Sequence, residues 1–187
     1  MKMSDEIKIE ASRERVFAAL NDLEILRQAI PGCEQLERTS ETELTVTVQA
    51  KIGPVKARFQ GAVVLSDIKP PESYTISGKG KGGVAGFAEG TAQVTLRDDD
   101  GGTILAYQVE ANVGGKLAQI GARLIEGTSK KLAGEFFEAF AALVPTDPET
   151  APPVIVVSAV ARDARRLAWA VAGSLMMLAA VLLTIFG

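Results

Sequence analysis

Apolar and polar residues alternate with a period of two through the middle of the chain, in runs separated by turn-forming residues. Two of these runs flank the turn residues Gly53 and Pro54, and Pro70 and Pro71 interrupt the pattern again. Such alternation predicts an antiparallel sheet that is wet on one face and covered on the other. The expected strands cover residues 7–9, 44–52, 55–65, 88–96 and 103–113, with a further one beginning at Tyr74.

Helical spacing marks the segments before and after these strands. Ser12 is the expected N-cap of a first short helix, and a second short helix stops at Pro31 and Gly32. After the strands, apolar residues recur three or four positions apart over roughly 28 residues, which predicts one helix about 40 Å long. These residues are Leu117, Ile120, Leu124, Leu132, Phe136, Phe140 and Leu143. A sheet with one apolar face needs a cover, and this helix is long enough to provide it.

The predicted fold is therefore α+β, with the order β-α-α-β-β-β-β-β-β-α and a curved antiparallel sheet around a long C-terminal helix. This domain covers residues 1–143, and residues 144–166 form a linker that is first rich in proline and then basic. Residues 154–157 are apolar for a linker. They fit either an interfacial approach to a membrane or a short docking strand for a partner.

The last long segment, residues 167–186, contains no Asp, Glu, Lys or Arg. Twenty helical residues span about 30 Å, the thickness of the hydrocarbon core of a bilayer. Trp169 lies near one end, and Arg162, Arg165 and Arg166 precede the segment, which keeps that flank in the cytoplasm. We expect a tail-anchored protein in the cytoplasmic membrane with its N-terminal domain facing the cytoplasm. A docked amphipathic helix or an oligomer seam is the alternative.

Composition excludes several kinds of chemistry. The chain has no histidine, which rules out histidine-based triads and metal sites, and its single cysteine, Cys33, has no histidine partner. A net charge of −3 argues against nucleic acid as a partner. Residues 98–102 (DDDGG) are typical of a hairpin turn and lack the ligand spacing of a calcium loop. We therefore expect no metal site and no catalytic machinery, and the N-terminus shows no secretory signal.

Glycines crowd one expected hairpin between Gly78 and Gly90, where GKGKGG matches G-x-G-x-x-G. A dinucleotide fold needs a helix after that loop, whereas here the sequence leads back into a strand. The hairpin is either a flexible turn or a gate beside a cavity. Gly121, Gly127 and Gly134 lie within the expected long helix, where each costs about 1 kcal/mol. They either make room for a ligand or for bending, or allow close packing against the sheet.

Several short motifs, taken in order and spacing, resemble the family of the carbon monoxide dehydrogenase G subunit (CoxG). The resemblance covers about residues 2–143, and it places the domain in the START-like, helix-grip (SRPBCC) superfamily. The motifs are Pro31-Gly32-Cys33, Gly53-Pro54-Val55-Lys56, Gly83-x-x-Gly86-Phe87, Gly102-Thr103, residues 113–121 (VGGKLAQIG) and Phe136-Phe137.

The resemblance implies a partner and a ligand. CoxG-like proteins accompany molybdenum-flavin-iron-sulfur hydroxylases of the carbon monoxide dehydrogenase type and help to hold them at the membrane. Their cavity is linked to a respiratory quinone, menaquinone or ubiquinone, which receives electrons from the flavin. The residue pattern alone indicates only a tethered domain with an apolar groove. A lipid- or polyketide-binding protein or enzyme of this fold, unrelated to carbon monoxide oxidation, and a structural tether with a filled core are the alternatives.

Strand parity and helix spacing place seven side chains on the helix-facing side as the candidate cavity lining. They suit an isoprenoid or acyl chain, and among them Tyr107 is able to donate a hydrogen bond to a quinone oxygen. A solid core is the alternative. The seven are Phe59, Val63, Tyr107, Val109, Leu117, Ile120 and Leu124.

The hairpin supplies a candidate gate and docking edge formed by Lys79, Lys81 and Phe87. The two lysines offer positive charge that steers a negatively charged partner, and Phe87 offers an apolar anchor. A solvated hairpin whose lysines protect a sheet edge from aggregation is the alternative.

Overall fold

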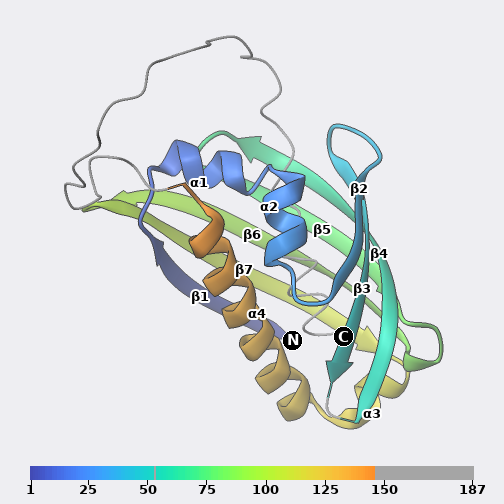
Figure 1. Cartoon of the computed structure of the whole chain (residues 1–187). Coiled ribbons are helices and arrows are strands. Elements are labelled where there is room, and N and C mark those ends of the chain that lie inside the picture. The colour runs from blue at the N-terminus through green and yellow to red at the C-terminus, as the bar shows by residue number, and fades with distance from the viewer. Residues whose placement is uncertain (53, 146–187) are drawn as a thin grey trace, which may run out of the picture.

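The computed structural model describes residues 1–52 and 54–145, and these residues form a curved antiparallel sheet with helices on one face (Figure 1). The seven strands of this part of the chain are ordered β1-β7-β6-β5-β4-β3-β2. The elements are β1 (Lys2–Ile9), α1 (Arg13–Ala19), α2 (Leu23–Ala29), β2 (Cys33–Arg38), β3 (Glu43–Ile52), β4 (Val55–Lys69), β5 (Ser73–Lys81), the 3-10 turn η1 (Gly83–Ala85), β6 (Phe87–Asp99), β7 (Gly102–Gly114), α3 (Lys116–Ile120) and α4 (Ala122–Leu143).

The predicted curved antiparallel sheet is confirmed, and so is the alternation of buried and exposed residues, whereas β2 lies outside the expected strand ranges. Val46 and Val48 of β3 are buried, while Thr45 between Leu44 and Val46 is exposed. The buried residues of each strand point to the face that α1, α2 and α4 cover, which we call the inner face (Figure 1). The opposite, outer face carries the polar residues, as expected for an antiparallel sheet that is wet on one side.

Aromatic rings join α4 to the sheet. Phe137 of α4 stacks on Tyr107 of β7 with ring centroids 5.4 Å apart, and Phe136 and Phe140 stack on each other within α4 at 5.7 Å. Val144 directly after α4 is also buried, and its N–H donates to the carbonyl oxygen of Phe140 over 3.0 Å. The packed core of the domain thus includes residue 144.

The expectation of one unbroken helix from Leu117 to Leu143 is wrong. Gly121 has a φ of +100°, which a helical residue cannot adopt, and it separates the five-residue α3 from α4. Close packing of the helical glycines against the sheet is also wrong. A Cβ atom built on Gly121, Gly127 or Gly134 would meet nothing within 4 Å. Gly127 and Gly134 are exposed on α4, so neither makes room for a ligand against the sheet.

Gly86 is required where η1 leads into β6. Its φ is +123°, and a Cβ atom there would lie 2.0 Å from the carbonyl oxygen of Gly114. We expect Gly86→Ala to lower the free energy of unfolding by about 2–4 kcal/mol, because strain and overlap add. Gly127→Ala, in open space on α4, should raise it by up to about 1 kcal/mol. Chemical denaturation measures both, and equal shifts would contradict the geometry of this turn.

Candidate functional site

Five of the seven expected lining residues are buried in the core between the sheet and the helices. They are Phe59, Val63, Tyr107, Val109 and Leu117, each at most 3% exposed. Ile120 is partly buried and packs against the same core.

Leu124 does not face the sheet, so its place in the expected lining is corrected. Its side chain is 45% exposed. The break at Gly121 changes the helical phase, and α4 turns Ile125, Ser129 and Ala133 inward instead.

Tyr107 lies in the middle of β7 under the ring of Phe137, with the two ring planes 21° apart. Burial, and to a smaller extent the negative charge of Asp5, raises the pKa of Tyr107 to about 12. Asp5 is opposite Tyr107 in the register of β1 and β7. The hydroxyl therefore stays protonated at physiological pH and remains a hydrogen-bond donor.

The inner face is partly open at the end of the sheet where α3 lies. Ala57, Val113 and Ile120 are only partly buried there, although each packs against the core. A Cβ atom on Gly80, on the inner face of β5, would have only the carbonyl oxygen of Gln60 within 4 Å, at 3.9 Å. The side chains next to α3 are thus small or only partly buried, and we call this incompletely covered part of the inner face the α3 opening.

Two glycines with positive φ flank α3, Gly115 at +81° and Gly121 at +100°. The helix between them has five residues and buries Leu117. Residues that absorb large backbone changes lie at the ends of moving elements. Gly115 and Gly121 are thus the candidate hinge positions at the two ends of the short helix beside the α3 opening.

Lys79, Lys81 and Phe87 come together on the outer face, not on the face that α4 covers. They line a hollow of about 590 Å³. Lys79 is opposite Glu89 in the register of β5 and β6, and Phe87 is opposite Gly114 in that of β6 and β7. The Phe87 ring covers this glycine, since a Cβ atom on Gly114 would lie 2.2 Å from it. These three residues therefore do not line the α3 opening, and their docking role stays a prediction.

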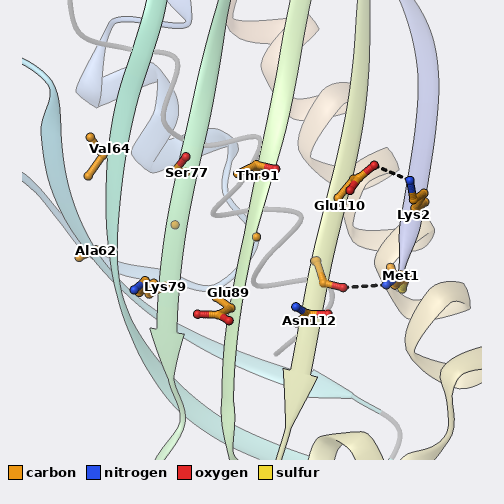
Figure 2. Close-up of a pocket in the computed structure, with 13 residues that line it drawn as sticks. Met1, Lys2, Ala62, Val64, Ser77, Lys79, Glu89, Thr91, Glu110 and Asn112 are labelled. Atoms are coloured by element: carbon orange, nitrogen blue, oxygen red, sulfur yellow. Dashed lines mark hydrogen bonds and ion pairs between the residues drawn. The ribbon is translucent and has the colours of Figure 1, made fainter.

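A second hollow on the outer face, of about 660 Å³, is shown in Figure 2. Lys2 pairs with Glu110 over 2.6 Å at its edge, and the amino terminus of Met1 donates to the carbonyl oxygen of Ala111 over 2.7 Å. The walls carry charges of both signs, including Lys79 and Glu89. This hollow lies on the opposite side of the sheet from the expected apolar cavity.

The structure also bears on the single cysteine, on metal sites and on membrane-spanning helices. Cys33 begins β2 and is half-buried, and burial raises the pKa of its thiol, which keeps the thiol protonated. Residues 1–52 and 54–145 contain no group of three acidic or cysteine side chains placed to hold a metal.

Within residues 1–52 and 54–145, no helix has the length and apolar character needed to cross a membrane. The expected anchor, residues 167–186, and nearly all of the linker, residues 144–166, lie outside the described residues.

The sequence matches the family model of the carbon monoxide dehydrogenase G subunit (CoxG), and the match covers residues 6–144. The chain belongs to the CoxG family. Among curated proteins, none matches this chain.

Solved structures support the fold of this CoxG-family domain. A conserved protein from Geobacillus kaustophilus is 32% identical, with a TM-score of 0.73, over 77% of this chain and 95% of that one. A START superfamily protein from Mycobacterium smegmatis is 12% identical, with a TM-score of 0.59, over 76% of this chain and 96% of that one. The expected START-like fold is confirmed.

Four residues of the site were not among the seven expected lining residues. Ala57 and Val113 continue the parity of Phe59 and Tyr107, so the alternation could have found them. Gly80 has no side chain that could contribute to the alternation of apolar and polar residues. The space next to it depends on how α3 is placed relative to β5, which the sequence does not give. Phe137 follows the buried Phe136 directly, and only the packing shows that both rings turn inward.

Proposed function

We propose that this protein is a membrane-anchored accessory protein that binds a respiratory quinone and recruits a cytoplasmic molybdenum hydroxylase of the carbon monoxide dehydrogenase type. The observation that carries the proposal is the α3 opening, the incompletely covered apolar part of the inner face beside α3, in a chain of the CoxG family. The quinone, menaquinone or ubiquinone, accepts electrons from the hydroxylase. In this proposal the chain acts by binding and positioning, and the chemistry belongs to the quinone and the partner.

The proposed ligand enters at the α3 opening and extends towards Tyr107. Val113 and Tyr107 are six residues apart on β7, which is about 20 Å, so the ligand must be elongated. Leu117 is fully buried, so α3 must swing on Gly115 and Gly121 to admit an isoprenoid chain. Apolar walls hold the chain, and the Tyr107 hydroxyl donates to a quinone oxygen.

Tyr107→Phe tests this assignment of the hydrogen bond. We expect the variant to keep its fold and to bind quinone about 3–10-fold more weakly, the effect of losing one hydrogen bond. For the wild type, affinity should stay constant between about pH 7 and pH 10 and fall as the pH approaches 12, because a raised pKa preserves the donor below that value. Quinone titrations across pH measure both. An unchanged affinity in the phenylalanine variant would exclude Tyr107 as the donor.

The proposed docking site for the hydroxylase is the outer-face hollow with Lys79, Lys81 and Phe87. Its lysines attract an acidic surface, and the exposed edge of Phe87 provides an apolar contact. Because Phe87 also covers Gly114, replacing it disturbs the sheet, whereas replacing the two lysines does not.

Recovery of the hydroxylase tests the proposed function. Full-length protein carrying Lys79→Glu and Lys81→Glu should recover at least about 10-fold less molybdenum-flavin enzyme from the cytoplasm than the wild type, since charge reversal replaces attraction by repulsion. The matched control carries Lys130→Glu and Lys131→Glu on α4 and should recover the wild-type amount. Equal recovery by all three proteins would remove the hollow from the interface. Lipid binding without any recovery by the wild type would favour a lipid-binding protein unrelated to carbon monoxide oxidation.

A further inference from the structure

Charge is segregated within the domain. Three segments meet at the α3 end of the molecule: residues 51–58, 79–89 and 114–124. Together they hold seven Lys or Arg residues and one acidic residue, Glu89, whereas the rest of the chain up to residue 145 holds ten basic and nineteen acidic residues. A domain that is acidic elsewhere thus has one strongly positive end.

The three segments form one surface, which we call the basic tip. Figure 1 shows α3 at the same end of the molecule as the turns that follow β3 and β5. η1 lies against both α3 and β4, and Gly86 approaches Gly115 so closely that a Cβ atom on Gly115 would be 2.6 Å from it. The basic residues of the tip are Lys51, Lys56, Arg58, Lys79, Lys81, Lys116 and Arg123.

Most of these cations lack an acidic neighbour. Arg58 pairs with Glu34. Within residues 1–52 and 54–145, no ion pair involves Lys51, Lys56 or Lys116, all of which are exposed. Their positive charge is therefore free to act on a ligand outside the chain.

The basic tip also carries exposed apolar side chains. Of the four large apolar residues that are exposed in the described part of the chain, Val84, Phe87 and Leu124 lie in it, and the fourth, Val64, lies on the outer face. Val84, on η1, is 84% exposed, so packing within the domain does not account for it. A cluster of exposed apolar residues among cations marks an interaction surface.

We infer that the basic tip docks on a membrane surface rich in anionic phospholipid, with Val84 entering the headgroup layer and Lys51, Lys56 and Lys116 contacting phosphates, while Lys79 and Lys81 remain in the outer-face hollow. Anionic lipid attracts clustered Lys and Arg residues, and apolar side chains add to the attachment. The three cations without an ion pair that would contact the phosphates are all lysines, a residue type that is depleted at the core of protein–protein interfaces. Val84 is moreover at the crown of a turn and not in a flat patch.

The position of the tip is compatible with a C-terminal anchor. α4 runs away from the tip for about 33 Å, and its last residue lies at the opposite end of the domain (Figure 1). Residues 146–166 can span at most about 70 Å, so the tether is long enough for the tip to reach the same membrane. Docking does not depend on quinone binding. In that orientation the α3 opening faces the bilayer, and an apolar ligand need not cross water.

Full-length protein with a fluorophore at residue 84 tests the docking. After Cys33→Ser, Val84→Cys is labelled with a polarity-sensitive dye, and Val64→Cys is the matched exposed control. Vesicles are of phosphatidylcholine alone or of an equimolar mixture with phosphatidylglycerol, each with a quencher on the acyl chains. We expect the dye at residue 84 to be quenched only in the anionic vesicles, and this quenching to disappear at high salt. The dye at residue 64 should not be quenched in either kind of vesicle. Because both kinds of vesicle hold the tail equally, the anchor does not affect the comparison.

Charge reversal provides the second arm of the test. Lys51→Glu, Lys56→Glu and Lys116→Glu together should lower the ratio of docked to undocked tip by at least about 100-fold, because the loss of each cation near an anionic surface costs about fivefold and each glutamate adds repulsion.

A control of equal net charge carries Lys2→Glu, Lys69→Glu and Lys130→Glu outside the tip and should dock like the wild type. Absent quenching at residue 84, equal quenching in both kinds of vesicle, or equal loss in the two triple variants would overturn the inference. Protection of residue 84 by an acidic protein but not by anionic vesicles would make the tip a protein interface and would also overturn it.

Discussion

Replacing Leu175 and Leu178 by arginine should release the protein from membranes into the soluble fraction. Both residues lie near the middle of the uncharged segment 167–186, where each arginine costs about 2.5–3.5 kcal/mol on insertion. Together they remove most of the preference of a twenty-residue segment for the bilayer. The measurement is the distribution of full-length protein between washed membranes and supernatant.

The wash should contain high salt, which removes attachment by the basic tip and leaves an inserted segment in place. Leu175→Ala with Leu178→Ala is the matched control and should stay with the membrane. A protein shortened to residue 145 should behave like the arginine variant. The cut belongs after Pro145, because Val144 is 4% exposed and part of the core. Full membrane retention of the arginine variant or of the shortened protein would show that the tail is not the main anchor.

Ile120→Trp should abolish quinone binding while the domain remains folded. Ile120 ends α3 and is only partly buried, so a larger ring has room to extend into the α3 opening. Filling that opening blocks the entrance and fixes the short helix against the sheet. The measurements are the retention of added quinone after gel filtration and the thermal unfolding midpoint.

Leu124→Trp is the matched control, because Leu124 lies four residues away and is exposed on α4. It should retain quinone like the wild type. If Ile120→Trp unfolds the protein and the wild type retains no quinone, the core is solid. If both tryptophan variants retain quinone equally, the ligand does not enter beside α3.

The strands and the core follow from short-range patterns in the sequence. Alternation alone identified Phe59, Val63, Tyr107 and Val109 as inner-face residues, and all four are buried. This works because the side-chain period of a strand is two wherever the strand is paired. The motif around residues 113–121 pointed to the family, and the family model confirms it.

The phase of the C-terminal helix did not follow from its pattern. Leu117, Ile120 and Leu124 have helical spacing, but Gly121 adopts a φ of +100° and restarts the helix. As a result Ile125 faces the sheet and Leu124 faces solvent. A glycine in a helical pattern lowers the helix propensity without saying whether the helix breaks there.

The basic tip depends on long-range placement. Its lysines come from three segments that are far apart in the chain and meet only when β3–β4, β5–β6 and α3 lie at one end. Composition gave a mildly acidic chain, because the excess of acidic residues elsewhere hides the positive end. Similarly, Lys79 and Lys81 were expected beside the cavity, and strand parity turns both to the outer face.

The most direct test of the proposed function is to identify the lipid that co-purifies with the protein. Full-length wild type and Ile120→Trp are purified from membranes in the same detergent, and bound molecules are extracted and identified by mass spectrometry. We predict about one isoprenoid quinone per wild-type chain, as expected for a single apolar site, and almost none in the variant. Equal quinone in both proteins, or only phospholipid in the wild type, would contradict quinone binding in this domain.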